Sequence, residues 1–354
     1  MERQLRIAVI GAGYWGPNLA RNFAASPDWE LAAICDLDRE RAEGLSARVG
    51  NVDVHTDVDE LLKRDDIDAV AIATPARTHH GLALRALAAG KHVMVEKPLA
   101  DAGHRGRAMV DTASASGLVL MADHTYCYTP AVLKIRELIQ EGALGDILFI
   151  DSTRINLGLI QPDVDVFWDL APHDLSIIDF ILPEGLTPQT LSAHGADPLG
   201  AGKSCVGYLV LPLANGAIAH VNVNWLSPTK IRQMVIGGTR RTLVWDDLNP
   251  QQRISVYDRG VDLGLQQVDG VERTAATVSY RLGDTWSPAL PEREALGQMA
   301  AEFAESIREN RAPRTDGEAG LRVLSVLEAA SRSLAAGGAS TAVEGFEKQL
   351  AGVL

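Results

Sequence analysis

Two short segments of the chain carry side chains that could bind a hydroxyl group and move its proton. In the first segment, Glu96 and Lys97 directly follow a short apolar run. In the second, Asp169 and His173 are four residues apart, so they share one face if the segment is helical. A carboxylate that holds one imidazole nitrogen leaves the other nitrogen free as a base, and a nearby lysine charge disfavours protonation of that base.

Each pair also has a structural interpretation that the residues alone leave open. Glu96 and Lys97 could form a solvated ion pair at the end of a strand. Asp169 could cap a helix, with His173 hydrogen-bonded in the core. Because proline is tolerated in the first turn of a helix, Pro172 predicts that this helix begins near Asp169.

A glycine-rich turn near the start of the chain predicts a dinucleotide site. Its G-x-G-x-x-G motif comprises Gly11, Gly13, Tyr14, Trp15 and Gly16. The motif follows an apolar run and precedes a helical pattern, the context in which it binds a pyrophosphate at the helix N-terminus. The alternative is a glycine-rich turn without a ligand.

Asp36 favours NAD as the dinucleotide. It ends the second apolar run, twenty residues after Gly16. A carboxylate at this place accepts hydrogen bonds from ribose hydroxyls and repels a 2′-phosphate, so NAD is favoured over NADP. The alternative role of capping the next helix could equally be filled by Asp38.

Apolar runs and helical patterns alternate through the first third of the chain. Strands expected at 5–10, 31–35, 69–73, 92–95 and 119–122 are separated by helical patterns at 19–25, 39–48, 57–64, 81–89 and 105–116. This alternation predicts an α/β Rossmann domain, with a doubly wound parallel sheet, over residues 1–123. Strand patterns dominate later, so residues 124–354 are predicted to form an α+β domain with a large, mostly antiparallel open sheet.

The composition argues against several other classes of protein. The chain has 354 residues and a net charge of −13, which disfavours nucleic-acid and anionic-membrane partners. It has no apolar run of roughly 18 residues, and its charged N-terminus leads directly into the first strand, so we expect no membrane span, no signal peptide and a cytoplasmic protein. Its three cysteines are far apart in the sequence, so neither a disulfide nor a metal site is expected.

Further motifs resemble the Gfo/Idh/MocA family of oxidoreductases over nearly the whole chain. They are Thr74, Pro75 and His79 in T-P-x-x-x-H, then A-G-K-H-V at 89–93 and E-K-P at 96–98. The resemblance implies that Lys97 is catalytic and lies beside the nicotinamide and substrate, and that His173 is the acid/base residue, paired with Asp169. It also implies cofactor contacts from Thr74, Pro75, His79 and Glu96, and a homodimer or homotetramer formed through the C-terminal sheet.

Residues 13–18 and 168–174 are also similar to the branch of this family that contains nucleotide-sugar 3-dehydrogenases. This implies NAD-dependent oxidation of a secondary hydroxyl, at C3 of a UDP- or dTDP-linked hexose, to a 3-keto sugar for amino-sugar or antibiotic-sugar biosynthesis. Candidate substrate contacts are Tyr126, Arg154, Asn156, Trp168 and Asp174. Lys230, Arg232, Arg240 and Arg241 could bind a diphosphate or form a solvated face of the sheet.

Other functions remain open. An inositol, free-sugar or sugar-phosphate dehydrogenase, or a ketoreductase working in the reverse direction, would use the same residues. A non-catalytic NAD-binding sensor belongs to a different class, because a fold alone does not determine function. The presence of Lys97, Asp169 and His173 argues against the sensor.

Overall fold

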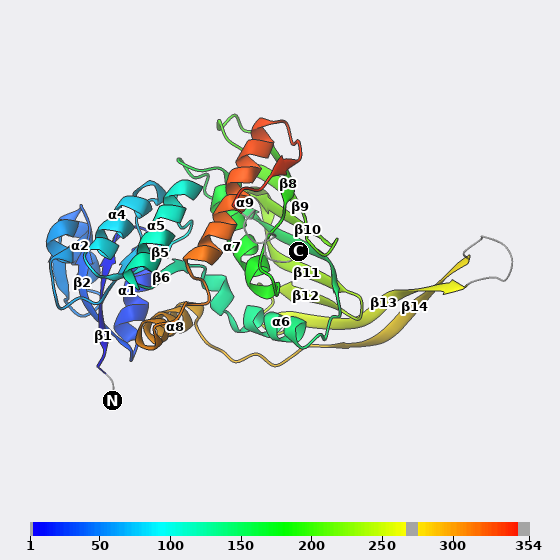
Figure 1. The fold of residues 1–354 in the computed structure, drawn as a ribbon, viewed down its shortest axis with the longest axis horizontal. Helices are drawn as coiled ribbons and strands as arrows, with labels where there is room; N and C mark the ends of the chain where they lie inside the picture. Colours follow the sequence, from blue (N-terminus) through cyan, green and yellow to red (C-terminus); the bar gives the residue numbers. More distant parts are fainter. Residues whose placement is uncertain (1–2, 267–274, 346–354) are drawn as a thin grey trace.

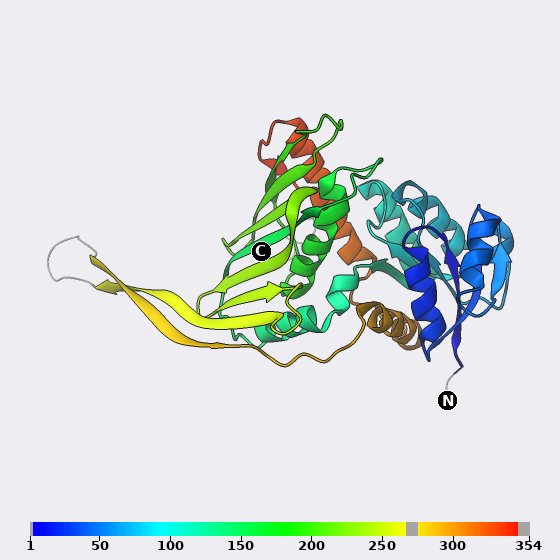
Figure 2. The ribbon, with the colours of Figure 1, turned by 180° about the vertical axis from the view of Figure 1, so that it is seen from behind.

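The computed structural model describes residues 3–266 and 275–345, which form two sheets joined and covered by helices (Figure 1). The N-terminal sheet lies at one end of the molecule. A long hairpin of β13 (Ile254–Gln266) and β14 (Ala275–Trp286) extends from the second sheet, away from the first. Figure 2 shows the same arrangement from behind.

The first sheet is parallel and doubly wound, with its strands in the order β3-β2-β1-β4-β5-β6. The strands are β1 (Leu5–Ile10), β2 (Trp29–Cys35), β3 (Asp53–His55), β4 (Ala69–Ile72), β5 (His92–Glu96) and β6 (Leu120–Asp123). The strand order reverses between β1 and β4. Ligands of such sheets bind at this point, outside the carboxyl ends of the strands.

The helices that connect these strands are α1 (Gly16–Ala25), α2 (Arg39–Ser46), α3 (Val58–Leu62), α4 (Ala76–Ala88) and α5 (Gly103–Ser116). The expected start of α4 at residue 81 is wrong, because the helix begins directly after Pro75. Its first turn therefore contains Thr78 and His79. The edge strand β3 escaped prediction because its three residues are at most partly buried and form no apolar run.

The second sheet has the order β14-β13-β12-β11-β7-β10-β9-β8-β15. Its other strands are β7 (Ile147–Leu157), β8 (Thr190–Ala196), β9 (Val206–Pro212), β10 (Ile218–Asn224), β11 (Leu226–Gly238), β12 (Thr242–Asp246) and β15 (Thr341–Ala342). Among the described pairs, β7 and β10 run parallel and the rest are antiparallel. The predicted fold class, a Rossmann sheet followed by a mostly antiparallel one, is confirmed.

Helices cover one face of the second sheet and leave the other open. The 3₁₀ helix η1 (Thr125–Tyr128) and α6 (Pro130–Gln140) follow β6, and α7 (Val166–Ile181), α8 (Ala295–Glu309) and α9 (Gly317–Ala335) come later in the chain. Of these, α7 packs on β9 and β10, and α9 packs on β8. On the opposite face, Tyr208 and Ile218 are exposed.

The last two helices also pack against the first sheet's helices, α8 on α1 and α9 on α5. Trp29 of β2 stacks on Phe303 of α8 with ring centroids 5.3 Å apart, and its Nε1 donates to the Ala300 oxygen at 2.7 Å. The predicted boundary after residue 123 coincides with the end of β6, and it stays a prediction because the two halves share this packed interface. Among the described residues, no helix is long and apolar enough to cross a membrane.

Candidate active site

The glycine-rich turn between β1 and α1 has a backbone shape that only glycine tolerates. Gly11 has a φ of +105°, and a Cβ there would lie 2.5 Å from the Ala73 oxygen. A Cβ on Gly16 would lie 1.9 Å from the Gly11 oxygen. Around Gly13, by contrast, no atom stands within 4 Å of such a Cβ. The turn is therefore tightly packed on its inner side and open on its outer side, which fits the phosphates of a dinucleotide.

The Asp36 carboxylate is fixed at the end of β2 and faces this turn. Its Oδ2 accepts a hydrogen bond from the Ala12 nitrogen at 2.6 Å, and its Oδ1 accepts from the Asp38 nitrogen at 2.9 Å. Asp38 is the residue that caps α2, since its side chain accepts from the Arg41 nitrogen. The capping alternative for Asp36 is therefore wrong. The carboxylate stands where the ribose of a dinucleotide would need an acceptor.

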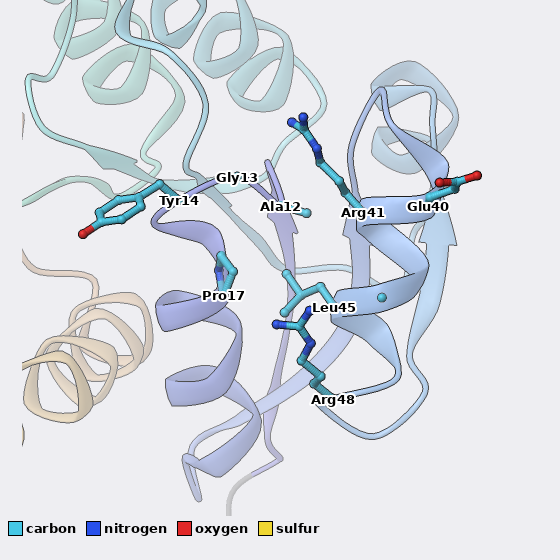
Figure 3. Close-up of a pocket in the computed structure, with 9 residues that line it drawn as sticks. Ala12, Gly13, Tyr14, Pro17, Glu40, Arg41, Leu45 and Arg48 are labelled. Carbon is cyan, nitrogen blue, oxygen red and sulfur yellow. The ribbon is translucent and has the colours of Figure 1, made fainter. Parts of the chain in front are cut away.

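A cavity of about 470 Å³ opens beside the glycine-rich turn, between α1 and α2 (Figure 3). It is lined by Ala12, Gly13, Tyr14, Pro17, Glu40, Arg41, Gly44, Leu45 and Arg48. Tyr14 is 94% exposed and points away from α2, whereas the Arg41 guanidinium is paired with Asp38 at 3.1 Å. With Asp36, the open turn and this cavity provide room and hydrogen-bonding groups for the adenosine half of a dinucleotide.

Lys97 and Asp169 meet across the two halves of the molecule. The Lys97 Nζ donates to the backbone oxygen of Asp169 at 2.8 Å and lies 3.6 Å from its Oδ1. The Asp169 Oδ2 accepts from Trp225 Nε1 at 3.0 Å. The Lys97–Pro98 peptide bond is cis. The expectation that the Asp169 carboxylate holds the imidazole of His173 is not met, because the Lys97 cation and the Trp225 donor occupy that carboxylate instead.

His173 lies one turn further along α7 and is partly buried. Its ring meets Tyr126 edge to face, with centroids 5.3 Å apart. Burial lowers the pKa of His173 well below its usual value, and the positive charges of Lys97 and Arg154 lower it further. The imidazole is therefore neutral near pH 7 and can accept a proton.

The expected start of α7 near Asp169 is wrong. The helix begins at Val166 and is capped by Asp165, whose Oδ1 accepts from the nitrogens of Phe167 and Trp168 at 3.0 and 3.1 Å. Pro172 therefore lies inside the helix, in its second turn. The four-residue spacing still places Asp169 and His173 on one face.

Arg154 and Asp174 form a buried ion pair beneath His173. Their side chains are 3% and 2% exposed, and Arg154 Nε donates to Asp174 Oδ2 at 2.6 Å. A second guanidinium nitrogen donates to the Tyr126 hydroxyl at 3.1 Å, and Ser152 donates to Asp174. Direct substrate contacts by Arg154 and Asp174 are not supported, because each buried charge is already satisfied by the other. The pair instead fixes the position of Tyr126.

The His79 side chain is buried, and both of its ring nitrogens meet backbone oxygens. It is 1% exposed, and its ring nitrogens lie 2.9 Å from the Pro98 oxygen and 2.7 Å from the Thr74 oxygen. The cofactor contact expected of His79 is therefore replaced by a positioning role, since the ring joins the loop after β4 to the turn after Lys97. Thr74 and Pro75 lie in that loop, and Thr74 packs against the glycine-rich turn at Gly11.

The other expected substrate contacts are only partly free. Trp168 donates its Nε1 to Ser331 of α9 at 2.9 Å, so its indole nitrogen is occupied. Asn156 is partly exposed on β7, and its amide group lies near Gly158, which packs on Trp225. Tyr126 is half-buried beside His173. Of the expected substrate residues, Tyr126 is the one the structure brings against His173.

Two residues of this site were not predicted. Trp225, which holds Asp169, follows β10 and carries no recognisable motif. Asp123 ends β6 opposite Glu96 in the sheet register and accepts from Trp15 Nε1 at 3.0 Å. Its position at the carboxyl end of an apolar strand, the same signal that indicates Glu96, would have identified it.

An open glycine-rich turn, a carboxylate at the end of β2 and a lysine near a neutral histidine are the features of an NAD(P)-dependent oxidoreductase. Comparison with known proteins supports the same class. The profile described as "Oxidoreductase family, NAD-binding Rossmann fold" matches residues 5–124, and the "GFO/IDH/MocA C-terminal domain" profile matches residues 132–244. The chain belongs to the Gfo/Idh/MocA family of oxidoreductases, as its motifs predict.

Two of the relatives are sugar 3-dehydrogenases. The chain is 29% identical over 323 residues to UDP-N-acetylglucosamine 3-dehydrogenase of Acidithiobacillus ferrooxidans, covering 90% of this chain and 94% of the relative. It is 32% identical over 213 residues to D-glucoside 3-dehydrogenase of Escherichia coli, covering 57% of this chain and 60% of the relative. A solved structure of the A. ferrooxidans enzyme superposes with a TM-score of 0.79 at 26% identity, covering 95% of this chain and 99% of that chain. The protein is a sugar oxidoreductase, an NAD(P)-dependent dehydrogenase acting on CH–OH groups.

The buried pair beneath His173 generates a prediction about stability. Asp174→Asn should lower the free energy of unfolding by about 3–5 kcal/mol, because it leaves the Arg154 charge buried without a counter-ion. The double variant Arg154→Met/Asp174→Leu removes both charges and should recover most of this loss, as measured by urea denaturation. The exposed pair Arg39–Glu43 offers the control, since Glu43→Gln should change stability by less than about 1 kcal/mol. Equal effects of Asp174→Asn and Glu43→Gln would contradict the prediction.

Proposed function

We propose that the protein uses NAD to oxidise the C3 hydroxyl of a nucleotide-activated hexose, UDP- or dTDP-linked, to a 3-keto sugar for amino-sugar or antibiotic-sugar biosynthesis. The observation that carries the proposal is the contact of Lys97 with Asp169, one turn from a neutral His173, at the carboxyl end of β5. The similarity to UDP-N-acetylglucosamine 3-dehydrogenase supports the sugar and the carbon, because it extends over 94% of that enzyme.

In this mechanism the chain's own residues manage the hydroxyl proton. The neutral ring of His173 takes the proton, and the Lys97 ammonium hydrogen-bonds the same oxygen and stabilises the developing alkoxide. Asp169 holds Lys97 in place through its backbone oxygen and carboxylate. When bound, NAD supplies the nicotinamide C4 that accepts the hydride.

The nucleotide part of the proposal has its support in Arg232. This side chain is one-third exposed, lies 3.5 Å from Asp247, and its charge acts on His173. Since Arg154 is committed to Asp174, Arg232 is a partly exposed cation near the base that could meet a phosphate.

A second candidate is a 3-dehydrogenase of free glycosides. The 32% identity to D-glucoside 3-dehydrogenase favours it, as does the loss of Arg154 as a phosphate donor. A substrate screen separates the two candidates: purified protein with NAD is mixed with UDP- and dTDP-hexoses, free glycosides, sugar phosphates and inositol, and NADH formation is followed by absorbance. Turnover of glycosides or inositol alone would refute the nucleotide-sugar proposal. Tight NAD binding without turnover of any sugar would favour the sensor.

The proposed roles of Lys97 and His173 predict both rate and pH dependence. His173→Ala and Lys97→Met should each lower kcat by roughly 100-fold. In the unaltered protein kcat/KM should fall with decreasing pH only below the usual histidine pKa of about 6.5, because burial and nearby cations keep the His173 pKa low. Lys97→Met removes one of those cations, so the His173 pKa rises and the acid limb of the residual activity should move to higher pH.

Lys134→Met is the control for these measurements, since Lys134 lies on α6 and pairs with Glu137. It should change neither kcat nor the position of the acid limb. An unmoved acid limb in Lys97→Met would count against the assigned partnership of Lys97 with His173.

Preference for NAD over NADP is proposed to rest on the Asp36 charge. Asp36→Ser removes the negative charge that would repel a 2′-phosphate, so the ratio of kcat/KM for NADP to that for NAD should rise by roughly tenfold or more. Asp38→Asn, which alters the cap of α2, should leave the ratio within about twofold of its original value. An unchanged ratio in Asp36→Ser would show that another group selects the cofactor.

We further propose that the open face of the second sheet joins copies of the chain into a homodimer or homotetramer. Tyr208 and Ile218 are 43% and 47% exposed on this face, on the neighbouring strands β9 and β10. Ile218→Asp should shift the sedimenting species toward the monomer, because it places a charge in the apolar contact. Ala24→Asp, on an exposed position of α1, should have no such effect. A monomeric unaltered protein would refute the proposal.

A further inference from the structure

Glu96 and Asp123 form a buried carboxyl pair at the edge of the cofactor site. They end the neighbouring parallel strands β5 and β6 and face each other in the register. Glu96 is 9% exposed and Asp123 is 2% exposed, so two neighbouring carboxyl groups are shielded from water. Two neighbouring buried carboxyl groups do not both ionise, so one of them carries a proton.

The surrounding donors identify which member is ionised. Asp123 accepts from Trp15 Nε1 at 3.0 Å and from Thr125 Oγ1 at 2.5 Å, whereas Glu96 accepts one backbone bond, from the Lys97 nitrogen at 3.0 Å. Burial raises the pKa of Glu96 well above its usual value, and the Asp123 charge raises it further. The pair therefore holds one proton, on Glu96, and one negative charge, on Asp123.

The strand order places this charge at the nicotinamide end of the site. Asp36 ends β2 on one side of β1, while β5 and β6 lie on the other side, beyond β4. A dinucleotide binds across the switch point, with its adenosine ribose at the β2 end. Its nicotinamide half then extends toward the ends of β5 and β6. Trp15 connects the two regions directly, because it belongs to the glycine-rich turn and donates to Asp123.

The residue after Asp123 is a second buried polar group at this corner. The His124 ring is 2% exposed, and neither ring nitrogen has a hydrogen-bond partner among the described residues. Burial lowers the pKa of His124 to about 4, while the Asp123 charge opposes this change and Lys97 adds to it. A neutral, buried and unpartnered imidazole beside Asp123 is costly unless a bound molecule or water satisfies it.

We propose that the Glu96–Asp123 pair sets which redox form of the cofactor the site prefers, because its single negative charge stabilises the cationic nicotinamide ring of NAD⁺ over the neutral ring of NADH. The inference rests on the NAD use of the proposed function and not on the identity of the sugar. NAD⁺ and NADH differ by one positive charge, located on the nicotinamide ring. A charge on Asp123, shielded from water, therefore acts on that difference, whereas its effect on the rest of the dinucleotide is the same for both forms.

A purely structural role would give a different result. If the pair serves only to hold Trp15 and the glycine-rich turn, its loss weakens NAD⁺ and NADH equally, since both forms use the same turn. If its charge acts on the ring, its loss weakens NAD⁺ alone. The ratio of the two dissociation constants therefore separates the two roles without any measurement of turnover.

The experiment compares Glu96→Gln with Glu96→Gln/Asp123→Asn. Asp123→Asn alone is avoided, because Glu96 would then ionise in its place. Glu96→Gln keeps a neutral donor and the Asp123 charge, so the ratio of Kd for NAD⁺ to Kd for NADH should stay within about twofold of its original value. The double variant removes the charge in the same background, and Kd for NAD⁺ should rise by about tenfold while Kd for NADH changes by less than about threefold. Calorimetry for NAD⁺ and fluorescence for NADH give these constants on the full chain without sugar.

Asp111→Asn is the matched control, because it removes a unit charge from an exposed position on α5, where the side chain is 66% exposed. It should not change the ratio. Equal weakening of both cofactor forms in the double variant, or an unchanged ratio, would overturn the inference.

Infrared spectroscopy keeps the proposal testable if the double variant does not fold. The unaltered protein at neutral pH should show the band of one protonated carboxyl group that Glu96→Gln lacks, and absence of that band would also overturn the inference. Failure of the unaltered protein to bind either cofactor form would refute NAD use itself, and the pair's role with it. A negative sugar screen combined with the expected binding ratio would refute only the proposed substrate.

Discussion

The contact between Lys97 and Asp169 is the constraint on which the site depends, because it joins the end of β5 to a helix of the second half. The lysine nitrogen meets both the backbone oxygen and the carboxylate of Asp169, and the two side chains are 19% and 20% exposed. A charge-assisted contact that is shielded in this way holds α7 in one position relative to the first sheet. His173 stands one turn further along α7. The distance between His173 and the glycine-rich turn is therefore set by the Lys97–Asp169 contact, in which His173 takes no part.

Buried charge then determines the protonation of His173. The pairing of Arg154 with Asp174 removes both from the surface of the site, yet the Arg154 charge still acts on the imidazole. Burial and the neighbouring cations keep the ring neutral without a carboxylate partner. The Asp169 carboxylate can therefore be bound by Lys97 and Trp225 while the His173 ring stays neutral. The spacing of Asp169 and His173 is thus informative about position and misleading about partnership.

The site residues whose position could be predicted from the sequence are those that directly follow a strand. The glycine-rich turn, Asp36 and Lys97 follow apolar runs directly, so strand prediction alone places them at one edge of the sheet. Asp123 obeys the same rule, and only its lack of a motif kept it from prediction. Helix starts were less predictable. The starts of α4 and α7 are set by Pro75 and Asp165, several residues before the apolar pattern becomes visible.

Contacts between distant segments could not be predicted from spacing. Trp225 reaches Asp169 from a segment 56 residues away, and the Arg154–Asp174 pair joins a strand to a helix. His79 shows the same limit: its motif suggests a cofactor contact, whereas two backbone oxygens, one of them 19 residues away, occupy its ring. A local pattern states which residue is present at a strand end. Which neighbour forms a hydrogen bond with that residue depends on the packing of the whole chain.

The two proposals, taken together, give the site opposite charges on its two sides. Lys97 places a positive charge where a hydroxyl would become an alkoxide, and Asp123 places a negative charge beside a nicotinamide ring that is positive before the transfer. Both charges favour the state in which the sugar hydroxyl has lost its proton and the hydride has not yet been transferred to the nicotinamide. Deprotonation would then be easiest when the oxidised cofactor is bound, since each charge is stabilised by its own partner. After the transfer neither the ketone nor the reduced ring carries charge, so both interactions weaken together and release of the reduced cofactor becomes easier.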